Sequence, residues 1–201
     1  MRFCVIGAGS MGSLYGGLLA RAGFDVTLVD VWQEHVDAIR RDGLHLDGIT
    51  GDVRIPIRAT SRVEDVSPVD CAIILTDANS TREAAEAARR VLGEAGFALT
   101  LQNGVGNVET LGEVLGGGRV MGGTSNHSAA LRAPATADAG NREPSFDRVD
   151  YASKSRAARI VGAGGPGSVR DIVTWLSGPR APSRTTRHGP GAGAPPPRGR
   201  G

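Results

Sequence analysis

Long apolar runs are absent from this sequence, and cysteine, lysine and aromatic residues are scarce. No segment reaches the roughly 18 consecutive apolar residues that a membrane-spanning helix needs, so we expect no membrane span. The short apolar run after Arg2 is interrupted by glycine before the core of a secretion signal could form, which favours a cytoplasmic protein. Cys4 and Cys71 both lie in apolar segments, and we expect them to be reduced packing residues in buried strands.

Signals for metal binding are also missing. The histidines and cysteines do not combine with carboxylates at the spacings that metal ligands show. The sequence therefore predicts no metal site, and it carries no signal for a particular oligomeric state.

Charge and proline are distributed unevenly along the chain. Residues 1–131 carry 11 Lys+Arg against 16 Asp+Glu, a net charge of −5, whereas residues 132–201 carry 12 against 5, a net charge of +7. Nine of the 11 prolines also follow residue 131. A segment rich in Arg, Gly and Pro has too little apolar surface to offset the entropy cost of ordering. We therefore expect a folded domain over residues 1–131 and a basic low-complexity tail over 132–201, largely disordered, with one short helix at 168–177.

The most informative stretch reads FCVIGAGSMG, residues 3–12, in which an apolar run leads directly into three spaced glycines. In a nucleotide-binding turn the first glycine allows a tight turn, the second lets the backbone approach a pyrophosphate, and the third lets the helix pack closely on the strand. The helix that follows directs its amides and positive dipole end at the phosphates. The pattern predicts that the diphosphate of a cofactor is bound by Gly7, Ala8, Gly9, Ser10, Met11 and Gly12.

The bare spacing is weak evidence because the chain contains 30 glycines, and the spacing recurs at Gly162, Gly164 and Gly167. We interpret this second copy as a chance match. Pro166 lies within its turn, and no strand ending in a carboxylate follows about 20 residues later.

Asp30 supports the first copy because it ends the next apolar strand, VTLVD, 18 positions after Gly12. A carboxylate there can accept hydrogen bonds from the ribose hydroxyls of NAD. It would repel the 2′-phosphate of NADP, and the next arginines, Arg40 and Arg41, lie within a predicted helix. Asp30 therefore favours NAD, with the alternative that it only caps the helix predicted for residues 32–41.

Apolar strands alternate with helical patterns up to residue 131. A hairpin is predicted for 43–57, strands for 70–76, from 97 and from 119, and helices for 80–92 and from 108. This order predicts an α/β fold with a Rossmann-type, doubly wound parallel sheet and right-handed crossovers. Ligands bind such sheets at the carboxyl ends of the strands, which places residues 7–12, 76–80 and 103–107 together.

Asn103 follows one of these strands in the segment LQNGVGN. Its amide can donate to a substrate carbonyl or carboxylate and accept from a hydroxyl. The alternative is that Asn103 and Gly104 only form a turn.

Four segments together resemble the ketopantoate reductases, also called 2-dehydropantoate 2-reductases: GAGSMG, the hairpin after IRRDGL, QNGVGNVETL and GGTSNHSAAL. The resemblance covers roughly residues 1–131. It implies reduction of 2-dehydropantoate to pantoate, in pantothenate biosynthesis, with NADPH as the usual cofactor. It also implies that Asn103 contacts both the nicotinamide cofactor and the substrate, and that the segment at Ser128 and Ala129 lies beside the cofactor.

The chain departs from the family pattern at two charged positions. Asp77 stands where many members have a cofactor-contacting lysine, and Asp30-Val31-Trp32 stands where many have an arginine suited to a 2′-phosphate. Both changes remove positive charge. They favour NADH over NADPH, or a relative that acts on another 2-keto acid.

The helical second domain of the family, which brings a catalytic lysine, is not recognisable in residues 132–201. Lys154 is the single lysine of the chain, and without apolar periodicity around it we interpret it as a solvated surface residue. The catalytic residues are therefore unknown. We hypothesise that the reading frame changes soon after Leu131, which would leave the chain without its catalytic domain and inactive.

Two other functions remain open. The chain can be a non-catalytic dinucleotide-binding module or fragment, or its basic tail can be an RNA-binding arm. The tail offers few aromatic residues for base stacking, so we do not expect nucleic-acid binding. For His127, which follows GGTSN, we favour a packing or hydrogen-bonding role over a proton relay.

Overall fold

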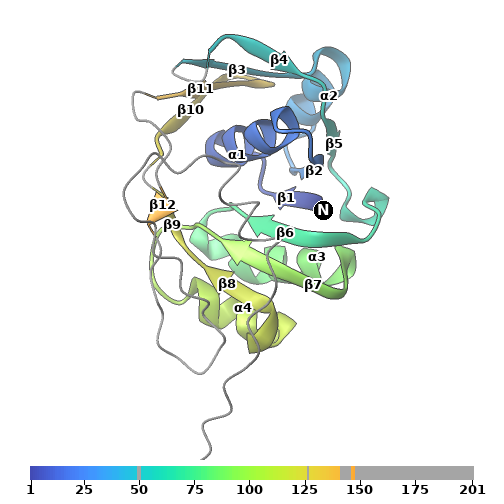
Figure 1. Cartoon of the computed structure of the whole chain (residues 1–201), viewed down its shortest axis with the longest axis vertical. Helices are drawn as coiled ribbons and strands as arrows, with labels where there is room; N and C mark the ends of the chain where they lie inside the picture. Colours follow the sequence, from blue (N-terminus) through green and yellow to red (C-terminus); the bar gives the residue numbers. More distant parts are fainter. Residues whose placement is uncertain (49–50, 126, 141–145, 148–201) are drawn as a thin grey trace, which may run out of the picture.

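A computed structural model describes residues 1–48, 51–125, 127–140 and 146–147, and its centre is a six-stranded parallel sheet (Figure 1). The strand order is β5-β2-β1-β6-β7-β8, and every neighbouring pair is parallel. The bounds are β1 Arg2–Ile6, β2 Asp25–Val29, β5 Arg58–Thr60, β6 Val69–Ile74, β7 Leu92–Thr100 and β8 Val120–Gly122. The predicted Rossmann-type sheet is confirmed.

Four α-helices within the described residues connect these strands: α1 Ser10–Arg21, α2 Gln33–Asp42, α3 Thr81–Val91 and α4 Asn107–Leu115. Three short 3-10 helices accompany them, η1 Val63–Asp65, η2 Ala78–Ser80 and η3 Gly117–Arg119. The predicted helices at 32–41, 80–92 and from 108 agree with α2, α3 and α4 to within one or two residues.

Side chains of β1 alternate between the two faces of the sheet and so belong to two separate cores. Phe3 and Val5 pack in the core that contains α1 and α2 residues, whereas Cys4 and Ile6 pack in the core formed with α3 and α4. This alternation follows from the two-residue period of a strand. A parallel sheet needs helices on both faces because neither face can be left in water.

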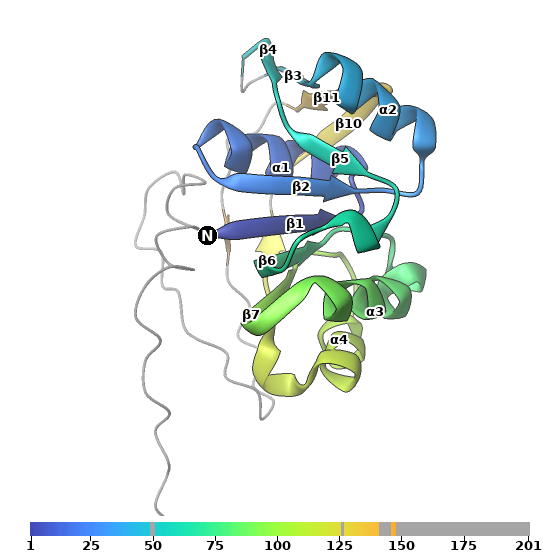
Figure 2. The same cartoon turned by 90° about the vertical axis from the view of Figure 1, so that its right-hand side faces the viewer.

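The predicted hairpin forms, but it leaves the main sheet. Its strands, β3 Leu44–Gly48 and β4 Val53–Ile55, pair antiparallel, with Leu44 opposite Ile55 and Leu46 opposite Val53. They join β10 Ala129–Ala133 and β11 Thr136–Ala139 in a second sheet of order β10-β11-β3-β4. Figures 1 and 2 show α1 between this second sheet and the main sheet.

The second sheet extends the regular structure beyond residue 131, where the sequence predicted the end of the folded domain. β11 pairs parallel with β3, and Ala135, Ala137 and Ala139 are buried against it in the core around α1. A short further pair joins β9 Thr124–Ser125 to β12 Phe146–Asp147. The predicted helix at 168–177 and the glycine copy at 162–167 lie outside the described residues.

Both cysteines lie where the sequence predicted, buried in neighbouring strands as free thiols. Burial raises the pKa of the Cys4 thiol to about 12 and raises that of Cys71 as well. Their side chains belong to different cores, so each acts as a packing group. Within the described ranges, no helix has the length and apolar character needed to cross a membrane.

Replacement of Leu46 tests whether the second sheet belongs to the core. Leu46 is fully buried against α1, where a Cβ on Gly17 would lie 2.8 Å from its Cδ1 atom. We expect Leu46→Ala to lower the free energy of unfolding by about 2–5 kcal/mol in urea denaturation. Val105→Ala, at a side chain that is 86% exposed, is the control and should change it by less than about 0.5 kcal/mol. A Leu46→Ala effect as small as that of the control would contradict the packing described here.

Candidate functional site

The three segments predicted to meet do lie at one edge of the main sheet. Residues 7–12, 76–80 and 103–107 follow β1, β6 and β7, which are neighbours in the sheet and run in the same direction (Figure 2). The backbone amide of Leu75 donates to the carbonyl of Ile6, which holds the first two segments side by side.

Gly7 and Gly12 are required by space within the turn. Gly7 has φ +91°, and a Cβ there would lie 2.7 Å from the backbone nitrogen of Thr76. At Gly12 a Cβ would lie 1.9 Å from the carbonyl oxygen of Gly7, because the first turn of α1 packs directly on the end of β1. These are the tight turn and the close helix contact that the spacing predicted.

Gly9 differs from both because the space above it is open. A Cβ at Gly9 would meet nothing within 4 Å, and its φ of −60° suits any residue. Gly9 is the N-cap of α1, which has no side-chain capping bond and no acidic residue in its first turn. Backbone amides of the first turn have no partner within the helix, so an uncapped start is a site for an anion.

Asp30 lies at the end of β2, on the same edge. Its Oδ1 atom accepts a hydrogen bond of 2.9 Å from the backbone amide of Trp32, just before α2. This bond forms a turn before α2, whose N-cap is Trp32 and has no side-chain cap bond, so it is not the helix cap of the alternative. The same carboxylate has a second oxygen with lone pairs for another donor, so one function does not exclude the other.

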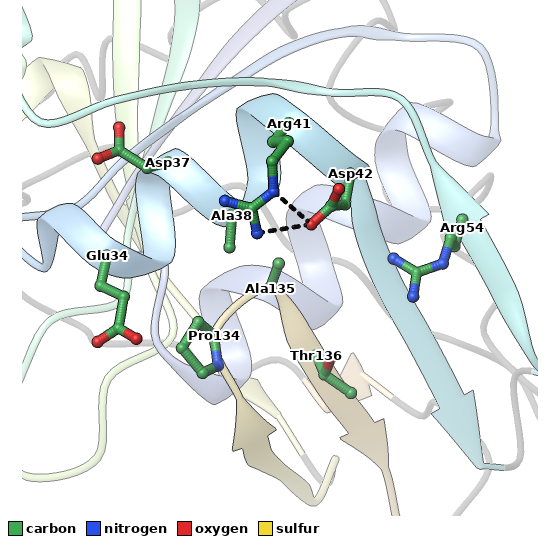
Figure 3. Close-up of a pocket in the computed structure, with 9 residues that line it drawn as sticks. All are labelled: Glu34, Asp37, Ala38, Arg41, Asp42, Arg54, Pro134, Ala135 and Thr136. Atoms are coloured by element: carbon green, nitrogen blue, oxygen red, sulfur yellow. Dashed lines mark hydrogen bonds and ion pairs between the residues drawn. The ribbon is translucent and has the colours of Figure 1, made fainter.

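The first two arginines after Asp30 in the sequence are engaged elsewhere. The Arg40 side chain donates to the carbonyl of Ala59 at 2.7 Å, and Arg41 pairs with Asp42 at 2.7 Å. Figure 3 shows Arg41 directed at Asp42 in a surface pocket of about 670 Å³ between α2, β4 and the turn at 134–136. None of the predicted site residues lines this pocket.

Gln102, which sequence reasoning passed over, joins the ends of β6 and β7. Its Nε2 atom donates to the carbonyl of Thr76 at 2.9 Å and lies 3.1 Å from that of Asp77. Its Oε1 atom accepts from the hydroxyl of Thr100 at 2.9 Å. The glutamine of the QNG segment therefore joins the ends of β6 and β7 by hydrogen bonds.

Asn107 fixes the other end of the same loop. It is buried at the start of α4, where its amide nitrogen donates to the carbonyl of Asn103 at 3.0 Å. The hydroxyl of Thr81 donates to its amide oxygen, also at 3.0 Å. Asn103 itself is exposed, and the bond from Asn107 holds its backbone carbonyl.

Asp77, one of the two charged positions at which we expected a departure from the family pattern, caps a helix. Its Oδ1 atom accepts from the backbone amides of Asn79 at 2.9 Å and Ser80 at 3.1 Å. The carboxylate thereby starts η2 and the turn into α3. Its role is structural, and the negative charge remains at the strand edge.

A cluster beneath this edge joins α1 to the segment after β8. The Tyr15 hydroxyl lies within hydrogen-bond distance of the Ser125 hydroxyl and of Nδ1 of His127. Burial raises the pKa of Tyr15 and lowers that of His127, so both are neutral near pH 7. This supports the hydrogen-bonding role favoured for His127. Ala129 begins β10 and packs against the core around α1.

Comparison with models of protein families identifies the family of this chain. The model of the ketopantoate reductase PanE/ApbA family matches residues 3–144. The chain belongs to this family. The predicted family is confirmed, and the match extends beyond residue 131, where the resemblance ended, to include β11 of the second sheet.

Curated relatives share the family name. A 2-dehydropantoate 2-reductase of Pyrococcus abyssi is 40% identical over 134 residues, which are 67% of this chain and 43% of the relative. One of Halobacterium salinarum is 35% identical over 178 residues, which are 87% of this chain and 58% of the relative. The chain thus spans about half the length of the curated relatives that it matches.

Solved structures of two enzymes have the same fold. A PanE/ApbA ketopantoate reductase of Ralstonia eutropha superposes with a TM-score of 0.67 at 32% identity, over 71% of this chain and 47% of that one. D-mandelate dehydrogenase, solved with NADH and anilino(oxo)acetate, gives 0.66 at 26% identity, over 70% of this chain and 46% of that one.

The Halobacterium alignment bears on the hypothesis of a changed reading frame. A span of 178 residues cannot fit within residues 1–131, so similarity to the family continues past Leu131. This alignment therefore counts against a change of frame directly after that residue.

The geometry of the turn predicts that alanine at two of its glycines destabilises the chain and that alanine at the third does not. Gly7→Ala and Gly12→Ala each force a backbone clash, so we expect each to lower the free energy of unfolding by at least about 2 kcal/mol. Gly9→Ala has open space and an ordinary φ, and should change it by less than about 0.5 kcal/mol. Thermal and urea unfolding measure all three. Equal losses at Gly9 and Gly12 would contradict the geometry of the turn.

Proposed function

We propose that this chain is the dinucleotide-binding part of an NAD(P)H-dependent oxidoreductase that reduces 2-dehydropantoate to pantoate or acts on a related 2-keto acid. The observation that carries the proposal is the open space over Gly9 at the uncapped start of α1. This open space lies at the same strand edge as Asn103. Asn103 is exposed, and its backbone carbonyl accepts a hydrogen bond from Asn107. Names of the family and of its curated relatives support the reaction class.

The residues at the edge fit a nicotinamide dinucleotide. The backbone of residues 7–12 would hold the diphosphate at the start of α1, and Asp30 would accept from the adenosine ribose. Asn103 would contact the nicotinamide and the substrate, and Ala129 would lie beside the cofactor. The cofactor, when bound, supplies hydride to the keto carbon. The chain itself contributes orientation: the Asn103 amide can donate to the carbonyl or carboxylate of the keto acid.

Charge at the edge favours NADH over NADPH. In this proposal the Asp30 carboxylate would repel a 2′-phosphate, and Arg40 and Arg41 are engaged with Ala59 and Asp42. Asp77 adds a second negative group, which caps η2 instead of binding phosphate. The D-mandelate dehydrogenase relative was solved with NADH, which agrees with this preference.

We assign no catalytic acid to the described residues. Reduction of a ketone needs a proton at the carbonyl oxygen as well as hydride at carbon. Tyr15 is buried, His127 is half-buried and lies within hydrogen-bond distance of it, and Asn103 has no titratable proton. The acid therefore comes from outside the described part of the chain.

A non-catalytic dinucleotide-binding module is the second candidate. It is favoured by the observation that the glycine turn is complete within the described residues, whereas we assign no catalytic acid among them. The two candidates share the cofactor site and differ in turnover.

Cofactor affinity tests the charge argument. We expect fluorescence titration to show NADH bound at least about tenfold more tightly than NADPH, equivalent to about 1.4 kcal/mol. Asp30→Asn should reduce that ratio because the repulsion of the 2′-phosphate is removed. Asp25→Asn, at the opposite end of β2 and paired with Arg58, is the matched control and should leave the ratio unchanged. Tighter binding of NADPH to the unchanged chain would overturn the preference.

Turnover separates the two candidates. The full chain is incubated with NADH and 2-dehydropantoate, and absorbance of the reduced nicotinamide is followed. Oxidation that depends on the keto acid supports the reductase, and Asn103→Ala should then lower kcat/KM by about tenfold or more. NADH binding without any such oxidation would favour the non-catalytic module.

A further inference from the structure

His35 is a fully buried histidine that neither the sequence motifs nor the proposed reaction accounts for. It lies on α2, behind the glycine turn. Its Nδ1 atom accepts a hydrogen bond of 2.9 Å from the backbone amide of Ala135, between β10 and β11. On the other side of the ring, Nε2 lies 3.4 Å from the hydroxyl oxygen of Ser13 on α1. One side chain thus links three elements that are distant in sequence.

The direction of these bonds fixes the protonation state of the ring. Because the Ala135 amide donates to Nδ1, that nitrogen carries no proton, and the proton of a neutral imidazole lies on Nε2. Nε2 can therefore donate to the Ser13 hydroxyl, which in turn donates to the carbonyl of Ala8 at 2.8 Å. The result is a single chain of hydrogen bonds from the β10–β11 turn into the glycine turn, and it requires a neutral His35.

Both ends of this series of hydrogen bonds lie at constrained backbone positions. Ala135 is the one residue other than glycine with positive φ, 57°, among those described, a strained conformation for a residue with a Cβ. Ala8 lies in the glycine turn itself and is 1% exposed. His35 therefore links a strained turn of the second sheet to the loop where the diphosphate is proposed to bind.

The surroundings of His35 disfavour a charged ring. Against it lie the Ser13 hydroxyl, the Ala135 amide and the indole of Trp32, which stacks on it with ring centroids 5.3 Å apart. Asp30 is the charged group that acts on it, and that carboxylate together with the Ala8 carbonyl favours the protonated form. Burial outweighs them and lowers the pKa of His35 below its usual 6.5.

We propose that His35 is a positioning residue for the diphosphate-binding turn, and that its neutral imidazole couples this turn to the β10–β11 turn through Ser13. The inference rests on the proposed function, in that the turn is taken to bind a dinucleotide. Protonation would place a second hydrogen against the Ala135 amide, so that two donors face each other and the link breaks. Dinucleotide affinity therefore falls when His35 is protonated.

The sign of the pH dependence follows from the lowered pKa of His35. In the unfolded chain this histidine takes up a proton near pH 6.5, whereas in the folded chain it does so only at lower pH. Its contribution to stability is therefore present above pH 6.5 and is lost as the pH falls through the folded-state pKa. Affinity depends on protonation of the folded chain alone, so it should decline only as the pH falls below the folded-state pKa.

The test is calorimetric titration of the full chain with ADP-ribose from about pH 7.5 down to the lowest pH at which the chain remains folded, because the pKa of buried His35 lies below the usual value of histidine. Once the pH is below the folded-state pKa, we expect the affinity of the unchanged chain to fall at least about fivefold. His35→Asn retains an acceptor near Ala135 that cannot be protonated, so its profile should be flat. His45→Asn is the matched control, a histidine on β3 paired with Asp52, and should keep the original profile.

Ser13→Ala provides a second variant that leaves His35 in place. It interrupts the chain between the ring and Ala8, so affinity at pH 7.5 should fall and its pH dependence should weaken. Thermal unfolding at pH 7.5 shows which variants are folded. Emission of Trp32 in a Trp175→Phe background follows the ionisation directly, because a protonated imidazole quenches a stacked indole.

Each remaining outcome decides between the claims. A flat profile for the unchanged chain, or the same decline in His35→Asn and Ser13→Ala, would overturn the role of His35 while leaving the proposed reductase intact. No ADP-ribose binding by the unchanged chain at any pH would overturn the cofactor site, and with it both proposals.

Discussion

The close approach of α1 to the strands on both sides is the constraint on which the rest of the structure depends. Gly12 brings the first turn of the helix against the Gly7 carbonyl, and at Gly16 a Cβ would lie 2.4 Å from Leu28 of β2. Gly17 does the same toward Leu46 of the second sheet. Glycines therefore allow one helix to be buried between two sheets while its start remains open at the strand edge. The proposed anion site is a result of this packing.

Much of this fold could be predicted from local patterns. The apolar run before Gly7, the strand ending at Asp30 and the hairpin around residues 44–55 have periods and turn residues that specify the elements. The pairing of β3 with β11 could not be predicted, because a parallel ladder between segments about 90 residues apart leaves no local signal. For the same reason the folded part was predicted to end at residue 131, whereas β11 continues to Ala139.

The candidate site, too, could be predicted only in part from the sequence. Spacing alone distinguished the three glycine positions, and the structure assigns each a separate geometric reason. Gln102, Asn107 and Asp77 were missed as structural residues because their partners lie on other strand ends and helices. A polar residue close in sequence to a candidate site residue can therefore indicate a side chain that fixes the loop by hydrogen bonds. His35 carried no such signal, since its contacts with Ser13 and Ala135 arise only after the second sheet has packed on α1.

The central claim is that the open start of α1 receives the diphosphate of a nicotinamide dinucleotide. Amide chemical shifts of the isotope-labelled chain, recorded while NADH is added, test it most directly. The account predicts the largest shifts at the amides of Gly9, Ser10 and Met11, with smaller ones in the loop at Asn103. Saturable shifts confined to the pocket around Glu34 and Arg54, with the amides of the glycine turn unmoved, would contradict it.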